Sequence, residues 1–146
     1  MTKIESMWIV GFVDGEGYFH IGIAQNSTYK LGIQVLPEFV ITQHQRDIKL
    51  LYAIKDFFGC GYIIQDKRGI CQYRVRTHTH LLDIIIPFFE RHSLKTMKKI
   101  DFLKFRKVVL LMEKGEHLTL EGLQKIRKIR EELQESNSNC NDINSI

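Results

Sequence analysis

The feature that most restricts the fold is an alternation of large apolar residues with small or polar residues early in the chain. Along residues 18–25 the odd positions 19, 21 and 23 carry large apolar side chains, and the even positions 20, 22 and 24 carry His20, Gly22 and Ala24. Alternation with a period of two predicts a strand that buries one face. A sheet of such strands needs helices on its apolar side and leaves its other side polar.

Periodicity along the rest of the chain predicts the remaining elements. Helical spacing indicates a first helix that ends near residues 14–17. It indicates further helices over residues 47–58, 81–91 (divided at Pro87), 96–114 and 119–135. Further strands are predicted over residues 31–42, 62–65 and 71–79. In the helix over 96–114, Ile100, Leu103 and Leu110 fall near one face. We therefore expect an α+β fold, a mixed αββαββα core with a four-stranded antiparallel, saddle-shaped sheet backed by helices. One domain should span residues 1–135, followed by a polar, disordered tail over 136–146.

Composition narrows the class of protein. The chain has 146 residues, of which 44% are hydrophobic and 26% charged, as in soluble globular domains. Its apolar runs are too short to span a membrane, so no membrane partner is expected. Three cysteines without CxxC spacing argue against a disulfide framework or a zinc site.

Charge is concentrated in the middle of the chain. Residues 41–110 carry 14 Lys and Arg against 6 Asp and Glu, whereas both flanking segments are mildly acidic. A basic middle segment suggests a surface that binds a polyanion. A solvated charged surface explains the same pattern equally well.

The segment that carries most chemical information is residues 9–17, with the sequence IVGFVDGEG. Gly11 and Gly15 are four residues apart, so they share one helical face and allow a close approach to a neighbouring backbone. Asp14 and Glu16 follow at once. These acids are either solvated groups at a glycine-capped helix end or oxygen ligands for a hard metal ion.

This segment resembles the signature of the LAGLIDADG homing endonucleases. Gly11, Asp14 and Gly17 match, and Glu16 supplies the acid at the eighth position, where many members have aspartate. Ile9 and Val10 replace the nominal Leu-Ala. Similarity continues in register through residues 18–23, 40–43, 57–61 and 98–102, and it covers roughly residues 5–112.

The resemblance implies a single-motif protein that acts as a homodimer, because no second signature is present. In this family the signature helices pair across a two-fold axis, which implies a dimer interface at Trp8, Gly11, Phe12 and Gly15. The face with Gly11 and Gly15 needs a partner on independent grounds. By symmetry, the double-stranded DNA target would be long and nearly palindromic.

The resemblance also implies the chemistry, which is site-specific hydrolysis of phosphodiester bonds on both DNA strands. It assigns Glu16 and Gly15 to a Mg²⁺ site that Mn²⁺ or Ca²⁺ could also occupy. The implied catalytic residues are Glu16, Gln43 and Lys98, with Lys95 and Lys99 as competing choices for the lysine. Asp14 is expected to be a structural acid.

The strands should read DNA with their outward faces, and nearby loops should grip phosphate. Arginine suits guanine and glutamine suits adenine. The expected contacts are His20, Gly22, Ala24, Lys30, Gln34, Glu38, Arg46, Tyr62, Ile64, Lys67, Arg68, Gln72, Arg74 and Arg76. For any one of these residues, a merely solvated side chain is the alternative.

Two other functions use the same fold. One is an intron maturase, which binds intron RNA as a splicing cofactor, and the other is a DNA-binding regulator without catalysis. Members of the family are commonly encoded in organellar introns, so a chloroplast or mitochondrial location is expected in preference to a prokaryotic cytoplasm.

Overall fold

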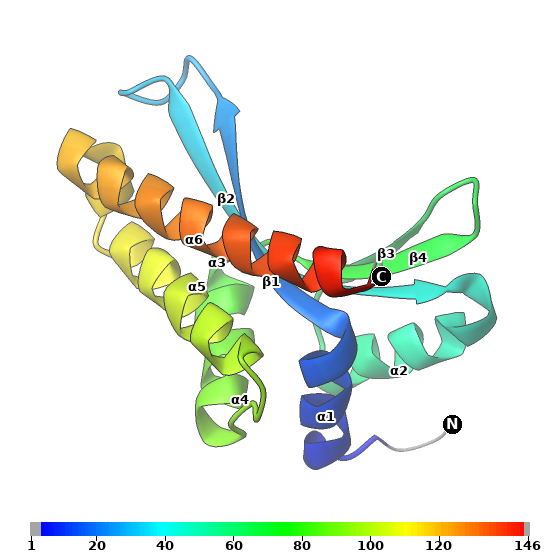
Figure 1. Ribbon diagram of the computed structural model, residues 1–146. Coiled ribbons are helices and arrows are strands. Elements are labelled where there is room, and N and C mark those ends of the chain that lie inside the picture. Colours follow the sequence, from blue (N-terminus) through cyan, green and yellow to red (C-terminus); the bar gives the residue numbers. More distant parts are fainter. Residues whose placement is uncertain (1–3, 145–146) are drawn as a thin grey trace.

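The computed structural model describes the backbone of residues 4–144 and the side chains of residues 4–135. Figure 1 shows the elements in chain order. They are α1 (Ser6–Glu16), β1 (Gly17–Gln25), β2 (Ile33–His44), η1 (Gln45–Asp47), α2 (Ile48–Phe58), β3 (Tyr62–Gln65), β4 (Ile70–Val75), α3 (His78–His80), η2 (Leu81–Ile85), α4 (Ile86–Arg91), α5 (Lys98–Glu113), η3 (Glu116–Leu118) and α6 (Leu120–Asn144).

The four strands form one antiparallel sheet in the order β1-β2-β4-β3. The two hairpins diverge from the centre of the sheet, and α1, α2 and α4 lie on the side away from their tips (Figure 1). The register places Phe19 of β1 opposite Phe39 of β2, which in turn pairs with Val75 of β4. The predicted α+β class and the four-stranded antiparallel sheet are therefore confirmed.

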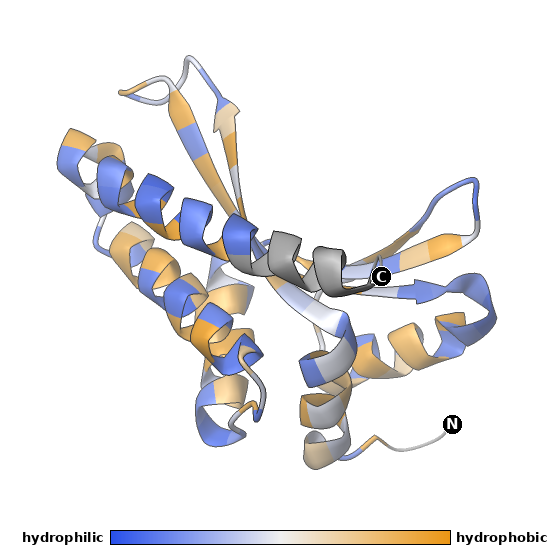
Figure 2. Cartoon of the chain, in the orientation of Figure 1, coloured by the Kyte–Doolittle hydropathy of each residue, from blue (hydrophilic) through white to orange (hydrophobic). Residues whose placement is uncertain are grey.

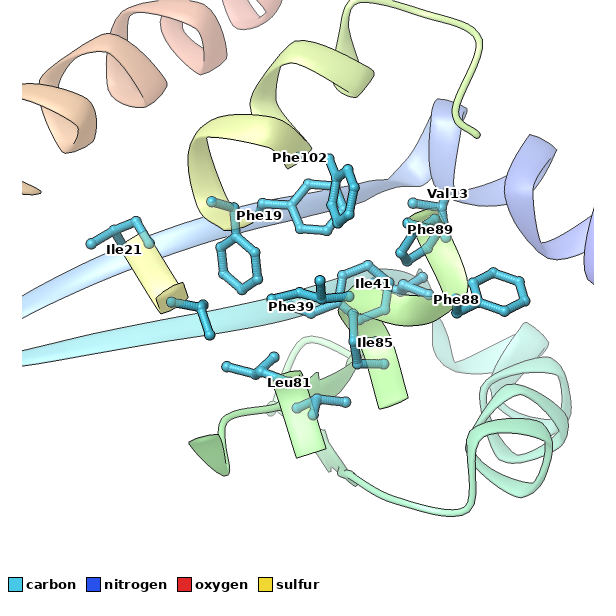
Figure 3. Packing of buried hydrophobic residues seen from close by; sticks show 14 of the residues in the cluster. Val13, Phe19, Ile21, Phe39, Ile41, Leu81, Ile85, Phe88, Phe89 and Phe102 are labelled. Atoms are coloured by element: carbon cyan, nitrogen blue, oxygen red, sulfur yellow. The ribbon is translucent and has the colours of Figure 1, made fainter. Parts of the chain in front are cut away.

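The core lies between the centre of this sheet and the helices. Phe19 and Phe39 have ring centroids 5.4 Å apart, and both rings contact Phe89 of α4. Phe102 of α5 adds a ring 5.5 Å from Phe19 (Figure 3). Phe105, also of α5, adds another at 5.2 Å. Each buried phenylalanine contributes about 1.5–3 kcal/mol from the area that it removes from water. This aromatic contact fixes how the helices sit on the sheet.

The β3–β4 hairpin is anchored to the core by Tyr73. Its hydroxyl donates a 2.8 Å hydrogen bond to the carbonyl oxygen of Cys60, in the short connection between α2 and β3. Gly61 follows with a φ of 88°, and a Cβ there would lie 2.6 Å from the Tyr73 ring. Glycine is needed at this position for both its left-handed backbone and the close ring. Tyr73 thereby ties β4 to the connection between α2 and β3.

Several predicted boundaries differ from the structure. β4 ends at Val75, and a short helical turn, α3, occupies residues that were predicted as strand. The helix is not divided at Pro87: the backbone stays helical from η2 into α4 and changes from a π-helical to an α-helical pattern just before it. Pro87 lies in the first turn of α4, where its missing amide is tolerated. Among the described residues, no helix combines the length and the apolar character that crossing a membrane requires.

The last helix is longer than the sequence predicts. α6 continues to Asn144, so residues 136–144 are helical where the polar composition predicted a disordered tail. Once a helix is nucleated by its packed part, here Leu123, Ile126 and Leu133, each added residue gains one backbone hydrogen bond. Figure 2 shows hydrophilic and hydrophobic residues alternating around the described part of this helix. The rest of the predicted tail, residues 145–146, lies outside the described residues.

Candidate active site and nucleic-acid face

One face of α1 packs on the sheet and the opposite face is open. Ile9, Val10 and Val13 are fully buried, whereas Trp8 is 47% exposed. A Cβ built on Gly11 or Gly15 meets no described heavy atom within 4 Å. The Trp8 ring stacks on Phe12, with centroids 5.0 Å apart and planes at 14°. The predicted interface residues therefore share one surface, which we call the glycine face; Trp8, Gly11 and Gly15 are exposed on it, and Phe12 is half-buried.

Glu16 is the last residue of α1, and its side chain is exposed. The next residue, Gly17, begins β1 and is buried, and a Cβ there would lie 2.9 Å from Cγ1 of Val13. Glycine thus permits an abrupt change from helix to strand. Because Gly17 pairs with Ile41, Gln43 lies at the end of β2 beside the end of α1. The structure brings the predicted Glu16 and Gln43 to the same end of the sheet.

Asp14 joins the end of α1 to the segment that leads into α5. Its carboxylate accepts hydrogen bonds from the amides of Lys95 (2.9 Å) and Thr96 (3.2 Å) and from the Thr96 hydroxyl (2.8 Å). Burial opposes ionisation of Asp14, but these bonds and the charge of Lys98 outweigh it and lower the pKa. Asp14 is therefore a structural acid, as predicted, and we call this arrangement the Asp14 clamp.

The clamp also places Lys98. The backbone amide of Lys98 donates to the Thr96 hydroxyl at 3.2 Å, and its charge acts on Asp14. Lys98 is half-buried, whereas its two competitors, Lys95 and Lys99, are exposed. The first turn of α5, with Lys98, thus lies at the end of α1 that carries Glu16. Its catalytic role stays a prediction.

The described residues of one chain do not form a complete metal cage. They contain no group of three or more His, Cys, Asp and Glu side chains arranged to hold a metal ion. What α1 offers is one exposed carboxylate, on Glu16, beside the carbonyl oxygen of Gly15. Magnesium prefers oxygen ligands, keeps several waters and often completes its shell with phosphate. These residues therefore fit Mg²⁺ where a second carboxylate and a phosphate are also supplied.

The outward side of the sheet carries many of the predicted DNA contacts. His20, Gly22 and Ala24 face away from the buried Phe19 and Ile21, so the predicted assignment of faces in β1 is confirmed. Further along this side lie Gln34 of β2, Tyr62 and Ile64 of β3, and Gln72 and Arg74 of β4. Outside the strands, Lys30, Arg46, Lys67 and Arg68 are exposed on loops and turns.

Glu38 differs from the other predicted contacts because it is buried. It lies on the same side of β2 but is only 8% exposed, and its carboxylate is within 3.6 Å of Arg74 and 3.3 Å of Arg76. A DNA contact of Glu38 stays a prediction, but within one chain its carboxylate is already paired with Arg74 and Arg76. Two basic neighbours hold its carboxylate within the protein surface.

Two further residues on this surface were not predicted from the sequence. Tyr18 of β1 is next to His20 on the same side, with an edge-on ring contact at 6.3 Å, and Thr42 of β2 accepts a hydrogen bond from Gln72. The alternation that placed His20 and Gln34 would also have placed Tyr18 and Thr42. Arg130 of α6 donates to the carbonyl oxygen of Ile21 at 2.9 Å, which covers part of the free edge of β1. No local signal in the sequence indicates that long-range contact.

The fold and the site together define a class of protein. It has a saddle-shaped antiparallel sheet with a polar to basic outward side, and an exposed, glycine-bearing helix that ends in a carboxylate at that sheet. The family model of the LAGLIDADG endonucleases matches residues 9–109, and the chain belongs to this family. The predicted family is therefore confirmed.

Named relatives agree with this assignment. The chain is 37% identical to probable intron-encoded endonuclease 2 of Neurospora crassa over 86% of its own length, and it spans about a quarter (26%) of that protein. It matches the crystal structure of the homing endonuclease I-TnaI with a TM-score of 0.88 and 49% identity, over 90% of this chain and 89% of the other. I-SmaMI, solved bound to an uncleaved DNA target in the presence of calcium ions, matches with a TM-score of 0.85 and 40% identity, over 88% of this chain and 44% of its own.

Proposed function

We propose that this chain is a site-specific DNA endonuclease that acts as a homodimer and needs a divalent metal ion. It hydrolyses phosphodiester bonds on both strands of a long, nearly palindromic target. The observation that carries the proposal is the glycine face of α1, which is exposed and ends at the exposed Glu16 beside the polar side of the sheet. Calcium and a DNA target in the I-SmaMI structure support it.

A two-fold axis along the glycine face supplies the second carboxylate that one chain lacks. The absence of side chains at Gly11 and Gly15 allows two α1 helices to pack closely, with Trp8 and Phe12 of each chain at the border. Because α1 ends at Glu16, close packing brings one carboxylate from each chain to the axis. The two sheets then extend in opposite directions, and each reads one half of a symmetric target.

The chain's own residues divide the chemical work. Glu16 and the Gly15 carbonyl oxygen offer oxygen ligands, Gln43 orients water at the end of β2, and Lys98 steadies negative charge near the scissile phosphate. When bound, Mg²⁺ would polarise that phosphate and help to ionise a water molecule. Chloroplast or mitochondrial origin, and intron RNA as a second ligand, stay expectations from the family resemblance.

Cleavage of a randomised duplex library with magnesium tests this function. Sequencing of the cut ends should reveal one preferred target with two related half-sites and breaks on both strands. Sedimentation of the protein without DNA should give about twice the 17.2 kDa mass of the chain. Absence of any cutting with magnesium or manganese, or a monomer that cuts both strands, would contradict the proposal.

A further inference from the structure

Glu38 is a buried carboxylate on the side of the sheet proposed to bind DNA. Its Oε2 atom lies 3.3 Å from Nε of Arg76 and 3.6 Å from Nη1 of Arg74, but neither contact has the geometry of a hydrogen bond. A buried charge without a compensating charge is costly. The two guanidinium groups offset the charge of the buried carboxylate, and Glu38 in turn holds both of them.

The two arginines are also tied to their other neighbours. Arg74 donates to Oε1 of Gln72 through Nε at 2.9 Å and Nη2 at 2.6 Å. The side-chain amide of Gln72 donates to the Thr42 hydroxyl at 3.3 Å, and Arg76 donates to the Tyr62 hydroxyl at 3.4 Å. A continuous polar network thus crosses three strands and includes Thr42, Gln72, Arg74, Glu38, Arg76 and Tyr62.

The charge of Glu38 also affects the pKa values of two residues in the edge strand β1. Burial raises the pKa of Tyr18, and the negative charge of Glu38 raises it further. Burial lowers the pKa of His20, and Glu38 opposes that effect while Arg130, Arg74 and Arg76 add to it. His20 pairs directly with Glu38 across β1 and β2. Glu38 therefore lies at the centre of the charged groups on this side of the sheet.

The network changes which groups of DNA Arg74 and Arg76 can bind. The donor edge of Arg74 that would read a guanine is occupied by Gln72, and the charges of both arginines are partly offset by Glu38. A phosphate offers acceptor oxygens and a full negative charge, and Glu38 offsets part of the positive charge that would attract it. A base edge of the right shape can replace the Gln72 oxygen with two well-placed acceptors. Satisfied contacts of this kind favour the correct partner over the wrong one.

We propose that Glu38 is a positioning residue, which holds Arg74 and Arg76 as one unit and thereby makes their recognition of DNA sequence-selective. The inference rests on the proposed DNA-binding function. It implies that the base pairs read by the two arginines are recognised together. It also implies that loss of the carboxylate turns both arginines into non-specific contacts with phosphate.

Glu38→Gln keeps the size of the side chain and removes the charge. Binding to the preferred duplex and to a random duplex should be measured over a range of salt concentrations. We expect tighter binding to random DNA, a salt slope that is steeper by about 0.9 for each additional phosphate that the variant neutralises, and a ratio of specific to non-specific affinity at least about tenfold lower. Glu38→Asp, which keeps the charge, should restore most of that ratio.

Glu90→Gln is the matched control. It removes the same charge from a carboxylate that pairs with Arg106 at 3.3 Å between α4 and α5. Neither Glu90 nor Arg106 belongs to the network or to the predicted DNA contacts, so the ratio of affinities should change little. Equal effects of Glu38→Gln and Glu90→Gln would overturn the proposal in favour of net charge alone. An unchanged ratio in Glu38→Gln with a lower melting temperature would overturn it in favour of a purely structural role.

A second measurement does not depend on changing Glu38. Arg74→Ala and Arg76→Ala, alone and combined, should each alter base preference at both positions, and their effects on affinity should depart from a simple product by about threefold or more. Independent, multiplicative effects would overturn the proposal. A wild-type protein without any sequence preference would overturn the proposed function too, whereas normal wild-type preference with an unchanged Glu38→Gln variant overturns only this inference.

Discussion

Replacing Gly11 with leucine should affect the stability of one chain and the association of two chains in opposite directions. Gly11 has helical backbone within α1, and a side chain there meets no described heavy atom within 4 Å. Glycine inside a helix costs roughly 0.5–1 kcal/mol relative to a good helix former such as leucine. The single chain should therefore become more stable by about 0.5–1 kcal/mol, which corresponds to a rise in melting temperature of about 1–4 °C for a domain of this size.

The same substitution should weaken the dimer. A side chain inserted where two helices pack closely costs about 1–3 kcal/mol from overpacking. The two-fold axis repeats that cost, so the interface loses about 2–6 kcal/mol, or about 30-fold to 10⁴-fold in the dissociation constant. The predicted changes in folding and in association have opposite signs, and no general destabilisation of the chain produces that result.

Sedimentation equilibrium over a range of concentrations measures association, and thermal unfolding at concentrations where both proteins are monomeric measures the fold. Gln124→Leu is the control, because it adds the same side chain at an exposed position of α6. It should leave the dissociation constant unchanged. If Gly11→Leu associates as tightly as the wild type, the glycine face is not the interface and the predicted pairing of α1 helices is wrong.

Three further predictions concern the site and its support. Glu16→Gln should abolish double-strand cutting in a magnesium-dependent assay and keep DNA binding, whereas Glu5→Gln, an exposed acid at the other end of the same helix, should keep both. Asp14→Asn should remove acid sensitivity that calorimetry detects in the wild type. Because the folded-state pKa of Asp14 is lowered from its ordinary value of 3.8, its stabilisation is complete above that value and is lost as pH falls through the lowered pKa. Equal pH profiles would contradict this. Tyr73→Phe should cost about 1–3 kcal/mol in denaturant unfolding, since it leaves the Cys60 carbonyl oxygen without its donor, and an unchanged midpoint would reject that contribution.

Local periodicity predicted the parts of the fold that depend on one face of one element. In β1 the side chains alternate with a period of two, so the burial of Phe19 and Ile21 followed from spacing alone. The end of the first helix near residues 14–17 also followed from local residue types, and the structural role of Asp14 came from the family resemblance. These features depend on residues that are close together in the sequence, so a local pattern is enough to predict them.

Spacing was less informative for α5, where two apolar faces compete. Ile100, Leu103 and Leu110 share a face as predicted, but each is about 40% exposed, whereas Phe102 and Phe105 are buried against the sheet. Helical periodicity identifies residues on a common face, but it does not say which face meets the core. The larger aromatic side chains bury more area, so they take the inner position.

The environment of Glu38 shows a different limit. Its place in β2 follows from alternation, but its burial depends on Arg74 and Arg76, which are brought alongside by the pairing of β2 with β4. An acid in a strand looks like a solvent-exposed residue until its neighbours across the sheet are known. The long-range pairing therefore determines whether the side chain contacts a ligand or organises other side chains that do.

The position of Asp14 directly before Gly15 and Glu16 links assembly to catalysis. Gly15 lies on the proposed interface and directly precedes Glu16, and the Asp14 clamp ties this turn to the segment before Lys98. A shift of the interface must therefore move the two Glu16 carboxylates of the dimer relative to each other, because little flexible chain separates Glu16 from the interface. Substitutions at Gly15 should then slow cleavage by more than they weaken DNA binding, since each sheet still reads its half-site. The opposite order, with binding lost first, would mean that the glycine face supports the DNA-binding surface rather than the reaction centre.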